Sequence, residues 1–253
     1  MREYDKKLKK IIPIRNGLGD NIIVNKVLSD LMGIYGSKKI IIGTAYPQVY
    51  NKTKSIATMD ILQSLEYEKI DKFNIYRFMF KNVWTEDIES AYVEMFTRDA
   101  TKNKTVLISP YSKKLKTSKN NAKNYPYFKE LVRLLKDDGI KTIQVGIEGE
   151  DSIGCDEDMF DLSIDNLTSL IEESYSWISV DNFFHHLAWT IGKRGNVIFG
   201  PSDPSIYGHS ENNNILRNKR YMVKNQFDVW ENIVFNELAF DEPNKVFEKL
   251  DFT

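Results

Sequence analysis

The sequence predicts an α/β protein made of two Rossmann-like domains that face a cleft. Short runs of β-branched residues alternate with helix-period patterns, which is typical of βαβ units around a parallel sheet. This alternation occurs twice, once from residue 9 and again from residue 105. At 253 residues, 42% of them hydrophobic, the chain is long enough to bury the cores of two such domains.

The first series is expected in an N-terminal domain of residues 1–104. Its patterns predict a strand, a helix with one apolar face and a second strand, at residues 9–15, 21–36 and 38–47. A glycine turn, NGLGD, separates the first strand from the helix and supplies the candidates Gly17, Gly19 and Asp20. The aromatic-rich stretch from residue 51 to residue 104 predicts only one helix, at 84–96.

The second series is expected in a C-terminal domain of residues 105–225. Strands are predicted at residues 105–110, 140–146, 176–181 and 196–200, and helices at 125–139, 163–174 and 182–195. Ser163 or Asp165 is expected to cap the second of these helices. Residues 226–253 are expected to form a separate C-terminal helical segment.

Candidate site residues follow the predicted strands. In parallel sheets, ligands bind beyond the carboxyl ends of the strands. The residues at those ends are Asp20, Ser109, Gly146, Asp181 and Gly200. These positions therefore predict where a ligand meets each domain.

Composition excludes several classes of protein. The net charge of −1 gives no general attraction to nucleic acid or membrane, and the one cysteine excludes an internal disulfide and cysteine-cluster metal sites. No apolar run approaches a membrane span, and the first ten residues lack the apolar core of a signal peptide. The expected location is the cytoplasm.

The charges are unevenly distributed along the chain. Residues 100–129 hold eight lysines and no acid, whereas residues 142–192 hold eleven acids and no Lys or Arg. A solvated face explains either block, and the lysine block can also contact phosphates.

Four motifs resemble glycosyltransferase family nine, the ADP-heptose:lipopolysaccharide heptosyltransferases, and they occur in the order of that family. They are GLGD, AKNYP, VGIEGED and DNFFHHLAWTIGKRGNVIFGPSDP, at residues 17–20, 122–126, 145–151 and 181–204. The last motif is the most specific, because it combines an aspartate, a histidine five positions later and a strand that ends in Gly-Pro-Ser-Asp-Pro. The resemblance is good over residues 105–208 and implies the GT-B architecture, with an N-terminal domain reduced in size.

This resemblance implies transfer of a sugar from an ADP- or UDP-type nucleotide-diphosphate sugar, with inversion and without a metal. Asp20 is the expected general base. Lys123, before a helix expected to begin near Pro126, is the expected cation for the diphosphate. The expected donor-binding residues are Gly17, Gly19, Ser109, Ser112, Lys123, Gly146, Glu150, Asp181, His186, Gly200 and Ser202.

Two of these assignments leave alternatives open. Glu150 is expected to bind ribose hydroxyls, and a solvated loop acid is the alternative. The family spacing selects His186 rather than His185, which is expected to pack or to lie on the surface. No cofactor and no metal site are expected, because two near-adjacent histidines and one carboxylate lack a third ligand.

The acceptor is the least determined partner. An aromatic segment containing Tyr46, Tyr50, Phe73 and Tyr76 is expected near Asp20, and aromatic faces suit both sugar rings and unstacked bases. A saccharide acceptor is preferred over DNA because the chain is nearly neutral. The alternatives are a bacteriophage-type transferase acting on a hydroxymethylated or glycosylated DNA base, and a nucleotide-sugar-binding module without catalysis.

Overall fold

The chain consists of two compact units, Met1–Met95 and Phe96–Thr253, and each is described by itself. The structure is a computed structural model that describes residues 10–14, 17–35, 40–50, 56–60, 104–116, 120–227 and 230–252. The predicted helix at 84–96 lies outside the described residues, as do Phe73 and Tyr76. The predicted domain boundaries, and the reduced size of the first domain, stay predictions.

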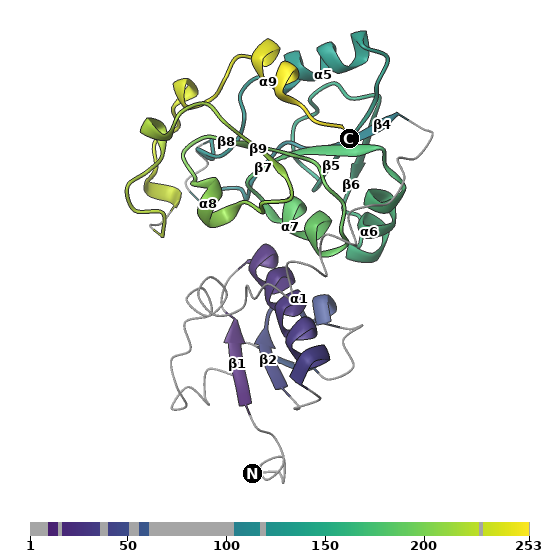
Figure 1. The fold of residues 1–253 in the computed structure, drawn as a ribbon, viewed down its shortest axis with the longest axis vertical. Helices are drawn as coiled ribbons and strands as arrows, with labels where there is room; N and C mark the ends of the chain where they lie inside the picture. Colours follow the sequence, from purple (N-terminus) through teal and green to yellow (C-terminus); the bar gives the residue numbers. More distant parts are fainter. Residues whose placement is uncertain are drawn as a thin grey trace. The chain divides into compact units, whose positions relative to one another are not determined.

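The first unit contains a parallel sheet of three described strands in the order β1-β2-β3. These strands are β1 (Lys10–Ile14), β2 (Ile40–Thr44) and β3 (Ile56–Asp60). Helix α1 (Leu18–Tyr35) connects β1 to β2 and lies along the sheet (Figure 1). Its residues Ile22, Val24 and Leu28 are buried, as is Ile42 of β2. A short 3-10 helix, Pro47–Tyr50, follows β2.

The second unit contains a six-stranded parallel sheet in the order β6-β5-β4-β7-β8-β9. The strands are β4 (Thr105–Ser109), β5 (Lys141–Gly146), β6 (Glu157–Phe160), β7 (Ser176–Val180), β8 (Asn196–Phe199) and β9 (Asn213–Leu216). This order is that of the dinucleotide-binding Rossmann fold, with the change of direction between β4 and β7. The predicted Rossmann-like architecture is confirmed.

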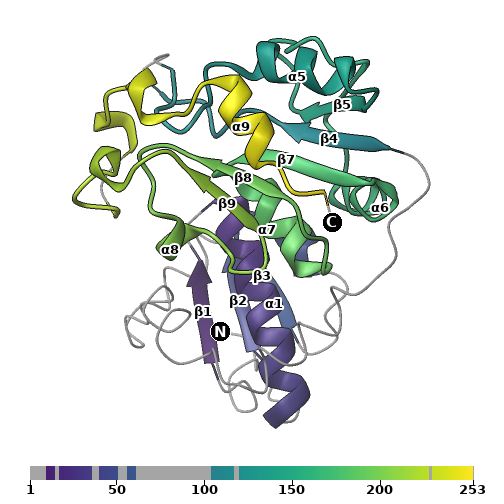
Figure 2. The same cartoon turned by 45° about the horizontal axis from the view of Figure 1, so that its top comes forward.

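Helices cover both faces of the second sheet (Figures 1 and 2). On one face lie α5 (Phe128–Asp137) and α9 (Pro243–Lys249), and on the other lie α6 (Ile164–Glu173) and α7 (Phe183–Thr190). The last described segment also contains the 3-10 helices Trp230–Asn232 and Glu237–Ala239. Phe240 and Val246 belong to the same core as the residues of α5, so this segment packs on the second unit.

Burial explains which strands the sequence pattern predicts. Every residue of β7 is buried, and a strand covered on both faces has a continuous apolar run. The outermost strands, β6 and β9, have the polar sequences EDMF and NNIL and were not predicted. Ser163 caps α6 as expected, since its side chain accepts a hydrogen bond from the backbone N–H of Asn166 at 3.2 Å. Among the described residues, no helix is both long enough and apolar enough to cross a membrane.

Candidate functional site

The first candidate group lies at the start of α1. The helix begins at Leu18, so Gly19 and Asp20 occupy its first turn and do not belong to a preceding turn. The carbonyl of Gly17 explains this early start, because it accepts hydrogen bonds from the backbone and the side-chain amide of Asn21 at 3.3 and 2.9 Å. Asp20 is half-buried at this helix start, where the helix dipole favours a carboxylate.

Asn21 holds the residues around Asp20 in place, and it was not among the residues predicted from the sequence. Its buried side-chain oxygen accepts hydrogen bonds from the hydroxyls of Thr44 at 2.6 Å and Tyr50 at 3.1 Å. Burial, with the nearby charge of Asp20, raises the pKa of Tyr50 well above its usual range, so this phenol stays protonated. Tyr50 therefore belongs to the core, whereas Tyr46 is half-buried.

In the second unit, the candidate residues gather where β4 and β7 end side by side. Ser109 ends β4, and Asp181 and Asn182 follow β7 directly. The side-chain amide of Asn182 donates to the hydroxyl of Ser109 at 3.0 Å and to the carbonyl of Tyr111 at 2.9 Å. Its side-chain oxygen accepts from the backbone of Phe184 at 2.9 Å and so caps α7. Asn182 thus joins the two strand ends at the point where ligands bind in this fold.

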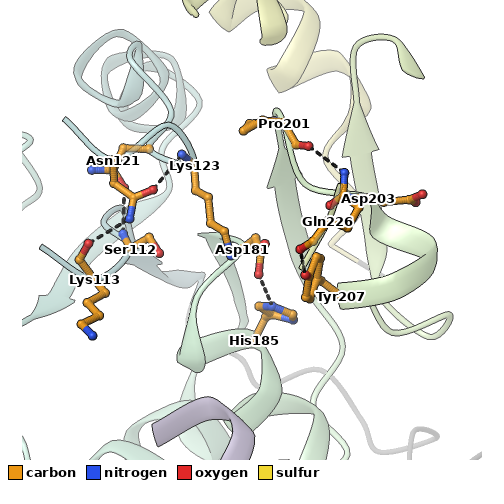
Figure 3. A network of polar contacts seen from close by, with 11 residues as sticks. Ser112, Lys113, Asn121, Lys123, Asp181, His185, Pro201, Asp203, Tyr207 and Gln226 are labelled. Carbon is orange, nitrogen blue, oxygen red and sulfur yellow. Dashed lines mark hydrogen bonds and ion pairs between the residues drawn. The ribbon is translucent and has the colours of Figure 1, made fainter. Parts of the chain in front are cut away.

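Lys123 and Asp181 form a buried ion pair at this point, as Figure 3 shows. Lys123 Nζ lies 2.8 Å from Asp181 Oδ2, and the two side chains are 12% and 4% exposed. The backbone N–H of Lys123 donates to Asn121 at 3.0 Å, which fixes the start of the lysine side chain. Both residues were predicted from the sequence as site residues, and in the structure they lie in direct contact.

An aromatic pair covers the ammonium group of Lys123. Nζ lies 4.0 Å from the ring centre of Trp230 and 5.1 Å from that of Tyr207, within the range of cation–π attraction. Tyr207 lies in the short helix α8 (Pro204–Tyr207), and its hydroxyl donates to the carbonyl of Gln226. The sequence contains no local signal that would have placed Trp230 or Tyr207 beside Lys123.

His185, rather than His186, lies against Asp181. His185 Nε2 is 3.6 Å from Asp181 Oδ1, and its ring is fully buried, so it is not a surface residue. Burial alone would raise the pKa of Asp181, but the charge of Lys123 and the contact with His185 hold it well below its usual range. Burial lowers the pKa of His185, although Asp181 opposes that shift. The arrangement therefore contains a carboxylate, an ammonium group and a neutral imidazole.

The ring of His186 lies beside that of His185 and contacts His209. His186 Nδ1 and His209 Nε2 are 2.8 Å apart, and the ring of Trp189 stacks on His209 with centroids 4.1 Å apart. Burial lowers the pKa of both histidines well below its usual value, so both imidazoles are neutral. The expected contact between His186 and a phosphate stays a prediction.

Gly146 and Glu150 form a second candidate group at the end of β5. The carboxylate of Glu150 folds over Gly146, since a Cβ on that glycine would lie 2.0 Å from Glu150 Oε2. This carboxylate also accepts from the backbone of Ile147 at 3.3 Å. Burial raises the pKa of Glu150, and the negative charge of Asp161 adds to the shift. A side chain at position 146 would therefore displace the carboxylate of Glu150.

The remaining candidates lie in the loops that follow β4 and β8. A Cβ on Gly200 would lie 2.4 Å from the ring of Phe240, so this glycine serves core packing. Ser202 is fully buried, and its hydroxyl has no hydrogen-bond partner among the described residues. The backbone N–H of Ser112 donates to the side chain of Asn124 at 2.8 Å, in the loop shown in Figure 3.

This arrangement can bind an anion. The ammonium group of Lys123 has three N–H donors, so it can form a charge-assisted hydrogen bond with a phosphate oxygen while one donor stays with Asp181. Helix α5 begins nearby in sequence at Phe128, and no described side chain caps its first turn. Its N-terminal N–H groups therefore provide additional donors for an anion.

Comparison with solved structures identifies the fold. The ADP-heptose LPS heptosyltransferase II of E. coli is similar with a TM-score of 0.61 and 11% identity, over 95% of this chain and 97% of that chain. A family 9 glycosyl transferase from Veillonella parvula has a TM-score of 0.54 and 14% identity, over 83% and 87%. The E. coli heptosyltransferase WaaC, solved with ADP, has a TM-score of 0.52 and 11% identity, over 79% and 89%.

No model of a protein family matches this sequence, and no curated protein does. At 11 to 14% identity, the similarity to solved structures concerns the fold. The resemblance seen in the four motifs is confirmed at that level. This chain has the heptosyltransferase-like GT-B fold, built from Rossmann-like α/β units.

Proposed function

We propose that this protein is a glycosyltransferase that moves a sugar from a nucleotide-diphosphate sugar, of ADP or UDP type, to an acceptor hydroxyl. The observation that carries this proposal is the buried Lys123–Asp181 ion pair at the ends of β4 and β7. Support comes from the shared fold, since the E. coli heptosyltransferase WaaC was solved both with ADP and with ADP-2-deoxy-2-fluoro heptose.

In this proposal, Lys123 balances the charge that develops on the departing diphosphate. Asp181 holds the ammonium group in position, and the uncapped start of α5 adds backbone N–H donors. Stabilisation by fixed positive groups is strongest where water is excluded, and the low exposure of both side chains fits that requirement.

Asp20 is the proposed general base. It accepts the proton of the acceptor hydroxyl as the acceptor oxygen bonds to the anomeric carbon and the bond from that carbon to the diphosphate breaks. Displacement in one step inverts the anomeric carbon. Protein cations, rather than a metal, take the leaving charge in this scheme. The position of Asp20 in the first turn of α1 supports this role, because the helix dipole interacts favourably with a carboxylate there.

The donor site is tested by replacing Lys123 with methionine, which keeps the length of the side chain and removes the charge. We expect Lys123→Met to weaken ADP or UDP binding by about 1–3 kcal/mol, because a charge-assisted bond is lost. Isothermal titration calorimetry measures the affinity. Lys245→Met is the matched control, since Lys245 is an exposed lysine of α9 outside the lysine block and its loss should leave the affinity unchanged. Equal affinity in the wild-type protein and both variants would show that this ion pair is not part of the donor site.

The catalytic role is tested separately at Asp20. We expect Asp20→Asn to retain its affinity for the nucleotide sugar and to lose transfer by a factor on the order of 10² or more, because the acceptor is no longer deprotonated. Transfer is measured with the sugar donor identified by a thermal-shift screen. Full turnover by this variant would exclude Asp20 as the base. Donor binding without transfer by the wild-type protein would favour a binding module.

A further inference from the structure

The three histidines of this chain meet in one buried cluster that the proposed transfer reaction does not use. His185 and His186 lie in α7, and His209 lies in the turn before β9. Their exposed fractions are 0%, 9% and 7%. One ring nitrogen from each lies within 4.8 Å of the others. The sequence showed no third metal ligand near His185 and His186. The fold brings His209, 23 residues after His186, into contact with them.

The rings are held in this arrangement from several sides. The closest nitrogens, His186 Nδ1 and His209 Nε2, are 2.8 Å apart. The ring centres of His185 and His186 are 3.8 Å apart. Trp189 stacks on His209 with an interplanar angle of 3°, which fixes the plane of that imidazole. A cluster built in this way needs little rearrangement of side chains to bind a ligand.

His185 provides a second, independent indication of a ligand. Both of its ring nitrogens are buried and have no hydrogen-bond partner among the described residues. A buried polar atom without a partner is costly, and such atoms in native structures call for a missing partner. Nε2 lies 3.6 Å from the carboxylate of Asp181, and in our proposal Nδ1 binds the ligand.

We propose that His185, His186 and His209 together bind one divalent transition-metal ion of the zinc class. Neutral imidazole suits Zn²⁺ and Co²⁺, whereas Mg²⁺ and Ca²⁺ require oxygen ligands. Zinc bound at about 2.0–2.1 Å in tetrahedral geometry places its ligand nitrogens about 3.3 Å apart. The nitrogens of this cluster span 2.8 Å to at most 4.8 Å, so small rotations of the rings bring them to that spacing.

Asp181 fits as the carboxylate behind one ligand. A histidine that binds a metal through one nitrogen usually donates its other N–H to a carboxylate, which fixes the ring and its tautomer. His185 Nε2 lies 3.6 Å from Asp181 Oδ1, so a small movement of the ring would bring the two groups into this relation. The ion would therefore fasten α7 to the turn before β9 and would position Asp181 through His185. This proposal does not depend on glycosyl transfer: of the three ligands only His186 is also an expected donor-binding residue, and metal binding is measured without a sugar donor.

The experiment uses the full chain without an affinity tag, stripped with a chelator and titrated with Co²⁺. We expect visible d–d absorption that saturates at one Co²⁺ per chain and disappears when Zn²⁺ displaces it. Zn²⁺ at a hundred times its dissociation constant should also raise the melting temperature by roughly 5–10 °C, because it binds only the folded state. His209→Phe keeps an aromatic ring on Trp189 without a ligand nitrogen and should abolish both effects.

Ser210→Ala is the matched control, because it alters an exposed residue of the same turn and removes no nitrogen ligand. It should bind Co²⁺ as the wild-type protein does. A histidine cluster held only by hydrogen bonds would give no absorption and no thermal shift in the wild-type protein, and that result would overturn the proposal even if His209→Phe failed to fold. Unchanged Co²⁺ absorption in a folded His209→Phe variant would also overturn it.

Discussion

The Lys123–Asp181 pair illustrates how much depends on single buried charges. Both side chains are nearly excluded from solvent, and removing one partner of such a pair leaves the other charge buried without compensation. The aromatic rings of Trp230 and Tyr207 add cation–π attraction, so Lys123 is held from two sides. A group held in this way suits the recognition of an anion, because little ordering is needed when the anion binds.

The three buried histidines predict how stability depends on pH. Burial holds the pKa of each below its usual value, whereas in the unfolded chain it returns to about 6.5. Below about pH 6.5, the unfolded chain thus binds more protons than the folded one. The contribution of the histidines to the free energy of unfolding is therefore fully present above this pH and decreases as the pH is lowered. Each histidine contributes at most about 1.4 kcal/mol per pH unit, or about 4 kcal/mol for all three.

We expect the free energy of unfolding, measured with urea and a chelator present, to decrease steeply between about pH 6.5 and pH 5.5. His209→Phe should reduce that slope by about a third, since one of three titrating groups is gone. Asp181 has a lowered pKa, so its contribution is lost only at lower pH, below about 3.9. A constant free energy across the upper window would show that the histidines are not buried as neutral groups.

At the scale of an element, the start of helix α7 depends on a single residue, Asn182. Its first turn is capped by Asn182, whose amide also joins the ends of β4 and β7. We expect Asn182→Ala to lower the free energy of unfolding by about 1–3 kcal/mol, because a helix cap and buried hydrogen bonds are lost together. Chemical denaturation measures this change.

Asn182→Ser separates the two contributions. Serine caps a helix well but is too short to reach both Ser109 and Tyr111, so it should recover only the capping part of the loss. Equal stability of the serine and alanine variants would show that the contacts with β4 matter more than the cap. No loss in either variant would contradict the role of Asn182 in joining these elements.

At the scale of the whole molecule, the distribution of charge distinguishes a DNA acceptor from a saccharide acceptor. Three lysines of the block at residues 100–129 lie exposed in the loop after β4, at positions 113, 114 and 116. A DNA acceptor bound by such lysines would show affinity that falls with salt, with a log–log slope near −0.9 for each phosphate neutralised. We expect a saccharide acceptor, whose binding changes little with salt. Binding and transfer are measured at low and physiological salt.

Transfer to hydroxymethylated DNA that is suppressed between those two salt concentrations would contradict the saccharide assignment. In that case, the lysines after β4 become the first residues to replace. A net charge of −1 and the acidic block at residues 142–192 argue against a duplex, because that block would repel phosphates.

The sequence by itself determined the alternation of strands and helices, the buried strands and the residues at their carboxyl ends. These features are local: an apolar run such as SWISV identifies a buried strand, and a serine before an amphipathic pattern identifies a helix start. It also indicated Lys123 and Asp181, because both follow predicted elements within recognisable motifs. The outer strands β6 and β9 could not be predicted in this way, because their polar residues carry no apolar period.

Only the tertiary structure decided which side chains meet. The choice between His185 and His186 depends on the rotation of α7 about its axis, which sets one ring against Asp181 and the other against His209. Trp230 reaches Lys123 across 107 positions of sequence, and no local pattern encodes such a contact. Long-range contacts arise because each helix and strand must bury its apolar face against the others, and that packing depends on the whole chain at once.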